Sequence, residues 1–335
     1  MSIARLKMDQ ISIFNEENGQ LSQCNKDSIC AWANKYFHLF VVNSPFHTQR
    51  AKKADLDKFL NYFSVTLNTA NPDSWTPSIT RGFQNYLAEQ RSPKSSLGYL
   101  ATTINRVLAT ARHFGNWLHE ERPLIAGAPF AGVKMTQVEE PSWNGLTSIE
   151  VLRLKSACDT RMNACKKNNQ NPLLEVTVFY LLLTTGLRES ELAQLTYAQY
   201  YAKGFHNVKR KGNKVTKKMP VPSEARELLE KYLQTKKDLQ NSDPLIVSRY
   251  GNRILTRDIA RICERIAKQA SAQLTEKDQI KLTPHMLRHT FLKRVADKHG
   301  VHTAQDLSGN ISMREIFRYT KPNYEQKHNI VEALY

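Results

Sequence analysis

Apolar residues recur at the three- and four-residue spacing of helices through most of the first part of the chain. Such stripes occupy residues 29–41, 56–63, 79–90 and 103–119, and Ser, Pro and Thr separate them. The pattern predicts a compact, all-helical domain of four or five helices over residues 27–134. Residues 1–26 are polar and show no periodicity, so we treat them as a loosely ordered arm.

The composition changes after this helical block. Residues 126–144 are rich in Gly, Pro and small side chains, which is typical of a connection between domains. We therefore predict a linker over residues 135–146 and a second domain over residues 147–335. Thr147 and Glu150 have the spacing of a capping box ahead of an apolar run, so the first helix of that domain is expected there.

The second domain has a mainly helical pattern. A helix from about Leu173 is predicted to end at Gly186, and a short helix follows over residues 189–195. The clearest signal for β-structure is Gly212-Asn213, which lies between two runs suited to paired strands. Further helices are predicted to begin at Ser223, Thr256, Pro284 and Ser312. The predicted fold class is mainly α, with a small β-hairpin or sheet in the second domain.

The charge balance points to an anionic partner. The 335 residues include 48 Lys and Arg against 31 Asp and Glu, which gives a formal net charge of +17 and a pI near 9.6. A surplus of this size raises the local concentration of polyanions and speeds their capture. Nucleic acid is therefore the first partner to consider, and a basic ribosomal-type or membrane-surface protein remains an alternative on charge alone.

Cysteine usage and hydropathy bear on the compartment. The five cysteines are odd in number and form no CxxC pair, so they suggest neither a disulfide framework nor a zinc site. The N-terminus lacks the apolar core of a signal peptide, and the longest apolar block, Val178–Leu183, is too short to span a bilayer. We therefore expect a cytoplasmic, nucleoid-associated protein without a membrane partner or a metal.

Basic residues are scattered over the helices of the first domain. A basic helical face is usually only a solvated face, but the block as a whole fits contact with DNA phosphates. The candidate contacts in this domain are Arg50, Lys52, Lys53, Lys94, Arg106 and Arg112.

A polar triplet follows the start of a predicted helix in the second domain. Thr283 as N-cap and Pro284 at the first helical position place His285 and Arg288 on one face, with His289 alongside. An arginine offers a bidentate fork and a histidine a titratable donor, so the triplet suits a phosphate. A surface polar turn without function is the alternative.

Arg188 stands at a break between two predicted helices. Gly186 can adopt the left-handed conformation that ends the first helix, and Arg188 would then project from a fixed corner. A functional corner arginine and a structural arginine paired to Glu191 are equally compatible with this segment.

The predicted hairpin has a basic tip. A lysine there can reach a phosphodiester, and a positive neighbourhood lowers its pKa toward the range of a proton donor. Nonspecific phosphate contact is the simpler interpretation for some of the four basic residues, which are Lys209, Arg210, Lys211 and Lys214.

A fourth segment positions a tyrosine. Ser312 and Glu315 form a capping box, and Ile311 with Ile316 has the spacing of a hydrophobic staple. Pro322 must end this short helix, because the residue before a proline avoids helical geometry. Tyr319 is thereby expected at the C-terminal edge of the helix.

In this order the four segments resemble the catalytic domain of the tyrosine recombinases, the phage-integrase family. The specific parts are TGLRESEL, KGNK and HMLRHTF, and the helical block before them resembles the SAM-like core-binding domain of that family. The resemblance covers roughly residues 27–335. It implies that the catalytic residues are Arg188, Lys211, His285, Arg288, Asn310 and the nucleophile Tyr319. Asn310 stands where the family usually has His or Trp; an amide can donate a hydrogen bond but cannot exchange protons.

The resemblance also implies a mechanism and a fold, a two-domain C-shaped DNA clamp. Tyr319 would attack a phosphodiester to form a 3′-phosphotyrosine, Arg188 and Arg288 would hold the nonbridging oxygens, and Lys211 would protonate the departing 5′-hydroxyl. His285 would bind the phosphate and assist proton transfer. Two arginines would supply the electrostatic stabilisation that a metal gives elsewhere, and reversal of the step needs no ATP, so we expect no cofactor.

The partners implied are double-stranded DNA and further copies of the chain. The family acts as a homo-tetramer on paired DNA sites, often for a mobile genetic element, and we expect a monomer or dimer away from DNA. A C-terminal tail from about residue 324 could dock on a neighbouring protomer or fold back on its own domain. Alternatives are a catalytically impaired DNA-binding accessory protein of the same fold, and a type IB-like topoisomerase or hairpin resolvase.

Overall fold

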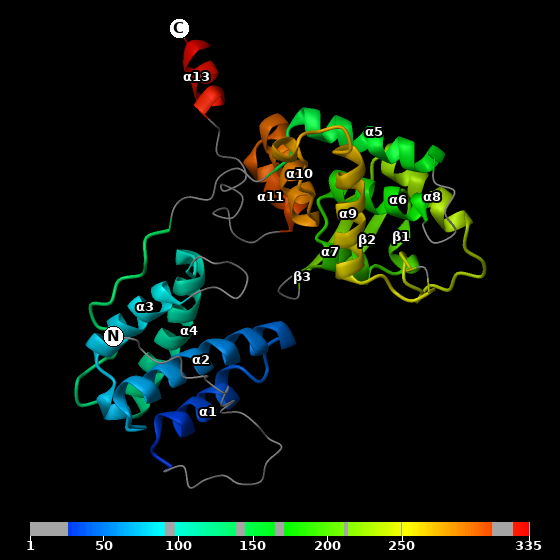
Figure 1. The fold of residues 1–335 in the computed structure, drawn as a ribbon. Helices are drawn as coiled ribbons and strands as arrows, with labels where there is room; N and C mark the ends of the chain where they lie inside the picture. Colours follow the sequence, from blue (N-terminus) through cyan, green and yellow to red (C-terminus); the bar gives the residue numbers. More distant parts are fainter. Residues whose placement is uncertain are drawn as a thin grey trace. The chain divides into compact units, whose positions relative to one another are not determined.

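The computed structural model describes residues 26–90, 98–138, 145–164, 171–210, 214–248, 250–309 and 324–334. The chain divides into two compact units between Glu140 and Pro141 (Figure 1). Among the described residues, no helix is both long and apolar enough to cross a membrane.

The first unit is all-helical, as predicted. Its elements are α1 (Ile29–Phe40), α2 (Phe46–Leu67), the 3-10 turn η1 (Pro72–Ser74), α3 (Pro77–Glu89) and α4 (Ala101–Glu121). Ser28 and Thr76 act as N-caps, because their hydroxyls accept from the backbone N–H groups three residues later. Aromatic side chains, Trp75 among them, fill the core between the helices.

The second unit is also mainly helical. It contains α5 (Ser148–Ala164), α6 (Pro172–Thr185), α7 (Glu189–Gln194), η2 (Tyr197–Gln199), β1 (Tyr200–Tyr201), β2 (Gly204–Arg210), β3 (Lys214–Pro220), α8 (Ser223–Gln234), α9 (Thr256–Ala270), η3 (Glu276–Asp278), α10 (Pro284–His299), α11 (Val301–Ser308) and α13 (Tyr324–Glu332). The predicted fold class, mainly α with a small β-sheet, is therefore confirmed. The sequence did not predict β1 or α11, and the predicted helix from Ser312 lies outside the described residues.

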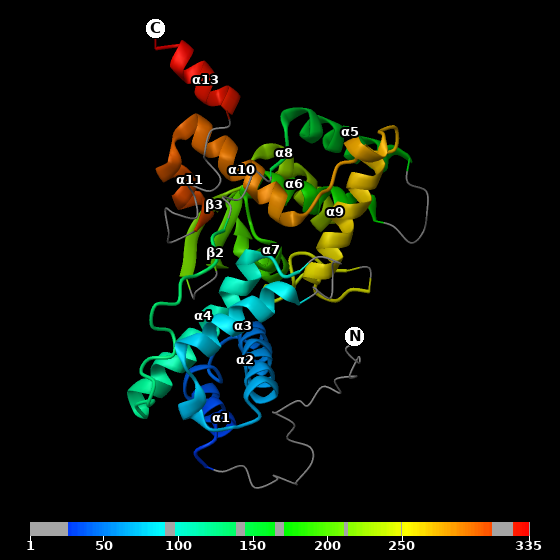
Figure 2. The same ribbon diagram turned by 60° about the vertical axis from the view of Figure 1, so that its left-hand side comes forward.

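Helix α6 forms the centre of this unit. It is apolar on all sides, as expected for a helix that is buried all round, and it contacts α5, α8, α9 and α10 (Figure 2). Its one buried carboxylate, Glu175, pairs with Arg161 of α5 and with Arg265 of α9, the latter at 2.7 Å. This ion-pair cluster ties three helices together.

The three strands form an antiparallel sheet in the order β1-β2-β3. In the β2–β3 hairpin Arg210 lies opposite Lys214, so the predicted Gly212-Asn213 falls between the paired strands, although residues 211–213 themselves are not described. Because side chains alternate along a strand, Val208 and Arg210 share the buried face of β2 while Lys209 is exposed.

The capping box predicted at the start of the second unit is confirmed. The backbone N–H of Thr147 donates to Glu150 Oε2 at 2.7 Å, and the backbone N–H of Glu150 donates to Thr147 Oγ1 at 3.2 Å. These reciprocal bonds satisfy donors that the first turn of α5 leaves without helical partners.

Candidate active site

Arg188 lies at the corner between α6 and α7. As predicted, α6 ends because Gly186 adopts a left-handed conformation with φ +63°. The backbone N–H of Arg188 donates to Glu191 Oε2 at 3.0 Å, and its Nη1 donates to Glu191 Oε1 at 2.8 Å. The side chain of Arg188 is still 21% exposed. The pairing with Glu191, one of two interpretations of the sequence, is thus present and leaves the guanidinium accessible.

Glu191 is shared between two arginines. Its Oε2 also accepts from Arg210 Nη1 at 2.6 Å, and the carboxylate is almost fully buried. Burial alone would raise the pKa of Glu191, but the charge of Arg210 and the hydrogen bonds and charge of Arg188 together lower it. The carboxylate is therefore ionised and can hold both guanidinium groups.

Arg288 joins the end of α6 to the end of α11. Thr283 caps α10 through the backbone N–H of Met286, and Pro284 is the first helical residue, both as predicted. Arg288 is only 1% exposed. Its Nη1 donates to the carbonyl of Gly186, and its Nη2 donates to the carbonyl of Ser308 at 2.9 Å. A buried guanidinium thereby fixes two backbone corners at once.

His285 lies one turn before Arg288 on α10. Although the residue as a whole is exposed, the protein around its ring removes enough water to lower the imidazole pKa below 6.5. The charges of Arg288 and Arg188 lower this pKa further, and Glu189 opposes them. His285 is therefore neutral at pH 7, so its ring can accept a proton.

His289 follows on the next turn, with its ring centroid 4.3 Å from that of His285. Burial, followed by the charges of His285 and Arg288, lowers the pKa of His289 to about 4. The two imidazoles thus form a neutral pair beside two guanidinium groups.

The structure brings together three of the six predicted catalytic residues, Arg188, His285 and Arg288. Arg288 lies one turn after His285 on α10 and donates to the carbonyl of Gly186, two residues before Arg188. The other three, Lys211, Asn310 and Tyr319, lie outside the described residues, as does the predicted DNA contact Lys94.

Arg210 is not the surface DNA contact that the sequence predicted. Its side chain is 1% exposed, and its guanidinium bonds to Glu191, to Thr216 Oγ1 at 3.0 Å and to the carbonyl of Leu307 at 3.3 Å. A group that is buried and bonded to three elements of its own unit is not available on the hairpin surface. The neighbours Lys209 and Lys214 are exposed.

The other candidate DNA contacts differ in exposure. Arg50 is exposed near the start of α2, and Lys52 and Lys53 are partly exposed. Arg106 is half exposed but bonds the buried Asp55, and Arg112 donates to the carbonyl of Val133 at 2.8 Å.

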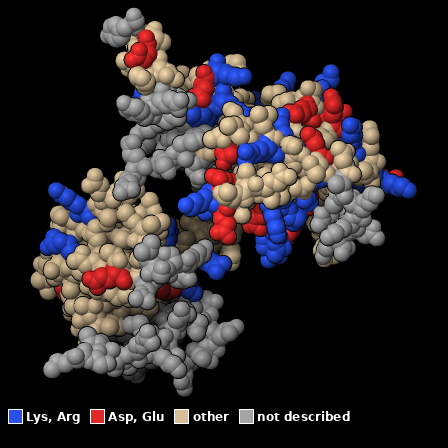
Figure 3. Space-filling model, turned by 45° about the horizontal axis from the view of Figure 1, so that its top comes forward, with Lys and Arg blue, Asp and Glu red and all other residues tan. Residues whose placement is uncertain are grey.

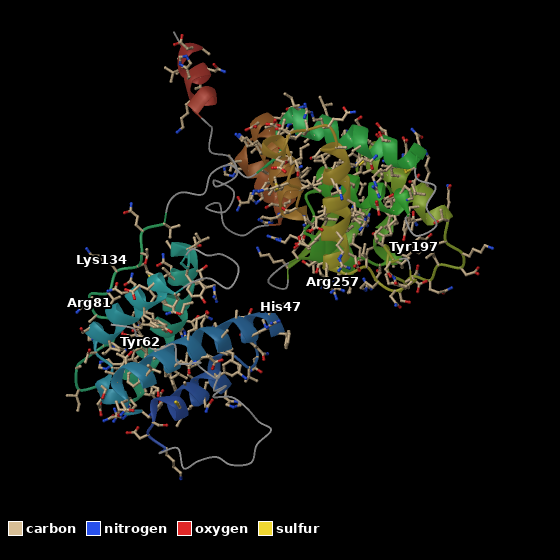
Figure 4. The ribbon with its side chains drawn as sticks, in the orientation of Figure 1. His47, Tyr62, Arg81, Lys134, Tyr197 and Arg257 are labelled. Carbon is tan, nitrogen blue, oxygen red and sulfur yellow. The ribbon has the colours of Figure 1, made fainter. Side chains whose placement is uncertain are left out.

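Basic side chains reach the surface of both units in one view (Figure 3). Figure 4 labels Arg81 on α3 and Arg257 on α9 among them, and both residues are exposed. Arg81 belongs to the basic helical block that the sequence indicated, whereas Arg257 lies outside the predicted contacts.

Sequence reasoning missed the shared role of Glu191 and the part played by Arg210. The alternation of side chains along a strand carried a signal for Arg210, because it places this residue on the same face as the apolar Val208. Nothing local in the sequence indicated the carbonyl groups at the end of α11, which accept from Arg210 and Arg288.

Comparison with known proteins decides the family. The sequence model described as "Phage integrase family" matches residues 146–326, more than half of the chain. The chain belongs to the phage integrase family. The resemblance seen in TGLRESEL, KGNK and HMLRHTF is thereby confirmed.

Curated relatives of this family member match over most of their length. The tyrosine recombinase XerC of Thermodesulfovibrio yellowstonii is 29% identical over 293 residues, which cover 85% of this chain and 88% of the relative. The tyrosine recombinase XerD of Listeria monocytogenes is 25% identical over 315 residues, with coverage of 88% and 97%.

Solved structures share the fold. A Tn1549 transposon integrase in complex with circular intermediate DNA aligns with a TM-score of 0.69 at 16% identity, covering 91% of this chain and 99% of the other. The XerH site-specific recombinase bound to palindromic difH substrate aligns with a TM-score of 0.67 at 17% identity, covering 87% and 80%. At these identities the likeness shows the fold alone.

Proposed function

We propose that this chain is a site-specific DNA recombinase that cleaves and rejoins DNA through a 3′-phosphotyrosine formed by Tyr319. The observation that carries the proposal is the bond from Arg288 of α10 to the carbonyl of Gly186, which brings Arg288 and its helix neighbour His285 to the corner that bears Arg188. The family match of the chain also includes Tyr319. The relatives named tyrosine recombinases and integrases support the same reaction. DNA is the partner, and the net charge of +17 suits it.

The arginines supply positive charge where the reaction builds negative charge. Attack on a phosphodiester places charge on the nonbridging oxygens, and preorganised donors stabilise that charge most in a water-poor site. Arg188 is exposed enough for direct contact with the phosphate. Arg288 is buried and bonded to two carbonyls, and its charge acts on the site from within the protein.

Proton transfer is assigned to three further groups. His285, whose pKa is lowered, would take up the proton of the Tyr319 hydroxyl and return it when the strand is rejoined. Lys211, which follows the last residue of β2, would protonate the departing 5′-hydroxyl. Asn310, directly after Gly309, would donate a hydrogen bond to a nonbridging oxygen without exchanging a proton.

Assembly as a homo-tetramer on paired sites is part of the proposal. Ile330 and Val331 of helix α13 and Leu334 in the turn after it are each more than half exposed. An apolar face of this kind suits packing against a neighbouring protomer better than contact with water. The size of the assembly on DNA can be measured by light scattering of the DNA-bound chain.

An accessory protein of the same fold without catalysis is the second candidate, and Asn310 is the residue that favours it. Covalent capture separates the two. The cleavage point is first mapped on DNA flanking the gene, and a duplex nicked beside that point is then incubated with the wild type and with Tyr319→Phe. We expect an adduct, resistant to denaturation, only with the wild type. An adduct formed by Tyr319→Phe, or none with the wild type, would contradict the proposal.

A further inference from the structure

Arg210 sits where three segments of the candidate active site meet. Each nitrogen of its guanidinium serves a different element: Nη1 donates to Glu191 on α7, Nε to Thr216 on β3, and Nη2 to the carbonyl of Leu307 on α11. Its planar fork has the donor geometry for such multiple contacts, which the single ammonium of a lysine lacks. The residue is thus a buried junction between α7, the hairpin and α11.

On one side the junction reaches Arg188. The carboxylate that accepts from Arg210 also accepts from the Arg188 guanidinium at 2.8 Å and from its backbone N–H at 3.0 Å. Glu191 is 4% exposed at its side chain, so water competes little with these bonds. Any shift of Arg210 would therefore displace the carboxylate that orients Arg188.

On the other side the junction reaches the end of α11. The last carbonyls of a helix have no partners within the helix and carry partial negative charge. Here Arg210 binds the carbonyl of Leu307 and Arg288 binds that of Ser308. Two guanidinium groups thus hold the end of the helix from which the chain continues to Asn310 and Tyr319.

Gly309 leaves the space that Arg210 occupies. It adopts φ +63°, and a Cβ at this position would lie 3.0 Å from Arg210 Nε and 3.2 Å from its Cγ. A Cβ at these distances would require Arg210, which is bonded to three elements, to shift by a few tenths of an ångström. Glycine is therefore favoured here both by its backbone conformation and by the close approach of Arg210.

We infer that Arg210 is a positioning residue for strand cleavage, which sets the place of Arg188 relative to the end of α11 without touching the DNA. The inference rests on the proposed function. It predicts that loss of Arg210 slows the chemical step while DNA affinity stays unchanged, because displacement of a reacting group by about 1 Å can cost roughly 100-fold in rate.

The first test compares Arg210→Met with Arg161→Met in the full chain. Arg161 is a buried arginine of the same unit, paired with Glu175 and Gln269 away from this site, so its loss is a matched control for destabilisation. Adduct formation is measured at saturating concentrations of the mapped, nicked duplex, on protein that is folded and bound to DNA. We expect a loss of about 100-fold for Arg210→Met, the wild-type rate for Arg161→Met, and equal DNA affinity for both.

The inference would be overturned if Arg210→Met cleaved DNA at the wild-type rate, or if both variants lost the same factor in rate. In either case an adduct formed by the wild-type protein would still support the proposed function. Absence of a wild-type adduct would overturn both. Amide hydrogen exchange gives a readout that needs no activity: residues 301–309 should exchange faster in Arg210→Met and not in Arg161→Met. Unchanged exchange in Arg210→Met would contradict the inference.

A second test adds bulk instead of removing it. Gly309→Ala brings a methyl group against Arg210, whereas Gly132→Ala at a similar φ of +66° meets open space and controls for backbone strain. We expect Gly309→Ala to slow cleavage and its penalty to shrink in the Arg210→Met background, since the two residues are in contact. Additive penalties, or an equal slowing by Gly132→Ala, would overturn the inference.

Discussion

The guanidinium of Arg288 donates to the carbonyl of Ser308 across 2.9 Å, from one turn of α10 to the end of α11. The same group donates to the carbonyl of Gly186, where α6 ends. One buried side chain therefore holds the corner before Arg188 and the helix end before Asn310. The stability of the site and its chemistry consequently depend on the same arginine.

Arg288→Lys should lower both the stability of the fold and the rate of strand cleavage. A lysine keeps the charge but cannot reach both carbonyls with a planar fork, so we expect a loss of roughly 2 kcal/mol in unfolding free energy. Adduct formation should fall by about 100-fold, because the corner before Arg188 would shift and a misplacement of about 1 Å at a reacting group can cost roughly that factor. Arg294→Lys, at an exposed position on the same helix, should change neither. Denaturant unfolding measures the stability of these variants, and single-turnover cleavage measures their rate of adduct formation. If Arg288→Lys were as stable as the wild type, the two carbonyl bonds of Arg288 would not stabilise the fold as described.

His289 should make α10 less stable in mild acid. Its pKa is about 4 in the folded chain against 6.5 for a free imidazole, so the unfolded state binds the proton more tightly. Stability is then lost as the pH falls from 6.5 toward about 4. His289→Gln should reduce this dependence, and His299→Gln, at an exposed site on the same helix, should not. Hydrogen exchange of α10 amides at several pH values measures the pH dependence of the helix's stability. Identical pH profiles for the wild type and His289→Gln would contradict the prediction.

Asp55 should make the first unit less stable as the pH rises, which is the opposite of the pH dependence expected from His289. Burial raises the pKa of this carboxyl despite the nearby Arg106, Thr110 and Lys58. A raised folded-state pKa favours the protonated form on folding, so its contribution to stability is lost as the pH rises above 3.8. We therefore expect Asp55→Asn to gain stability relative to the wild type as the pH rises above 3.8.

The buried Trp75 lies in the same unit and reports its unfolding by fluorescence. Asp159→Asn, exposed in the second unit, serves as the control and should follow the wild type at every pH. A constant difference between Asp55→Asn and the wild type across the pH range would show that Asp55 does not titrate as described.

The hairpin should separate phosphate contact from positioning. Lys209 is exposed on β2 and Arg210 beside it is buried. If Lys209 binds one phosphate, Lys209→Ala should reduce the slope of log affinity against log salt concentration by about 0.9. Arg210→Met should leave the slope unchanged. A salt titration of DNA binding measures both slopes. A reduced slope for Arg210→Met would show that Arg210 contacts a DNA phosphate and would contradict its role as a positioning residue.

Local signals in the sequence predicted many of the helices and the β-hairpin. The cap at Thr283, the end of α6 at Gly186 and the strands around Gly212-Asn213 depend on a few neighbouring residues, and the flanking elements formed as predicted. Helix α11 was missed because an eight-residue helix offers little periodicity. Its place follows from packing against α10.

Candidate site residues could be named from the sequence where they lie in a short motif. Arg188, His285 and Arg288 could be chosen from their segments, whereas the burial of Arg210 depends on Glu191 and Leu307, which lie 19 and 97 residues away in the chain. Contacts of that range come from tertiary packing, which a periodic pattern does not encode.

The central claim is that Tyr319 becomes covalently joined to a 3′-phosphate of DNA. The adduct trapped on the nicked duplex can be digested with a nuclease and with a protease that cuts after glutamate, which releases residues 316–325 with both Tyr319 and Tyr324. Fragmentation in a mass spectrometer then locates the nucleotide. We expect the added mass on Tyr319; its presence on Tyr324 or on any other residue would contradict the account.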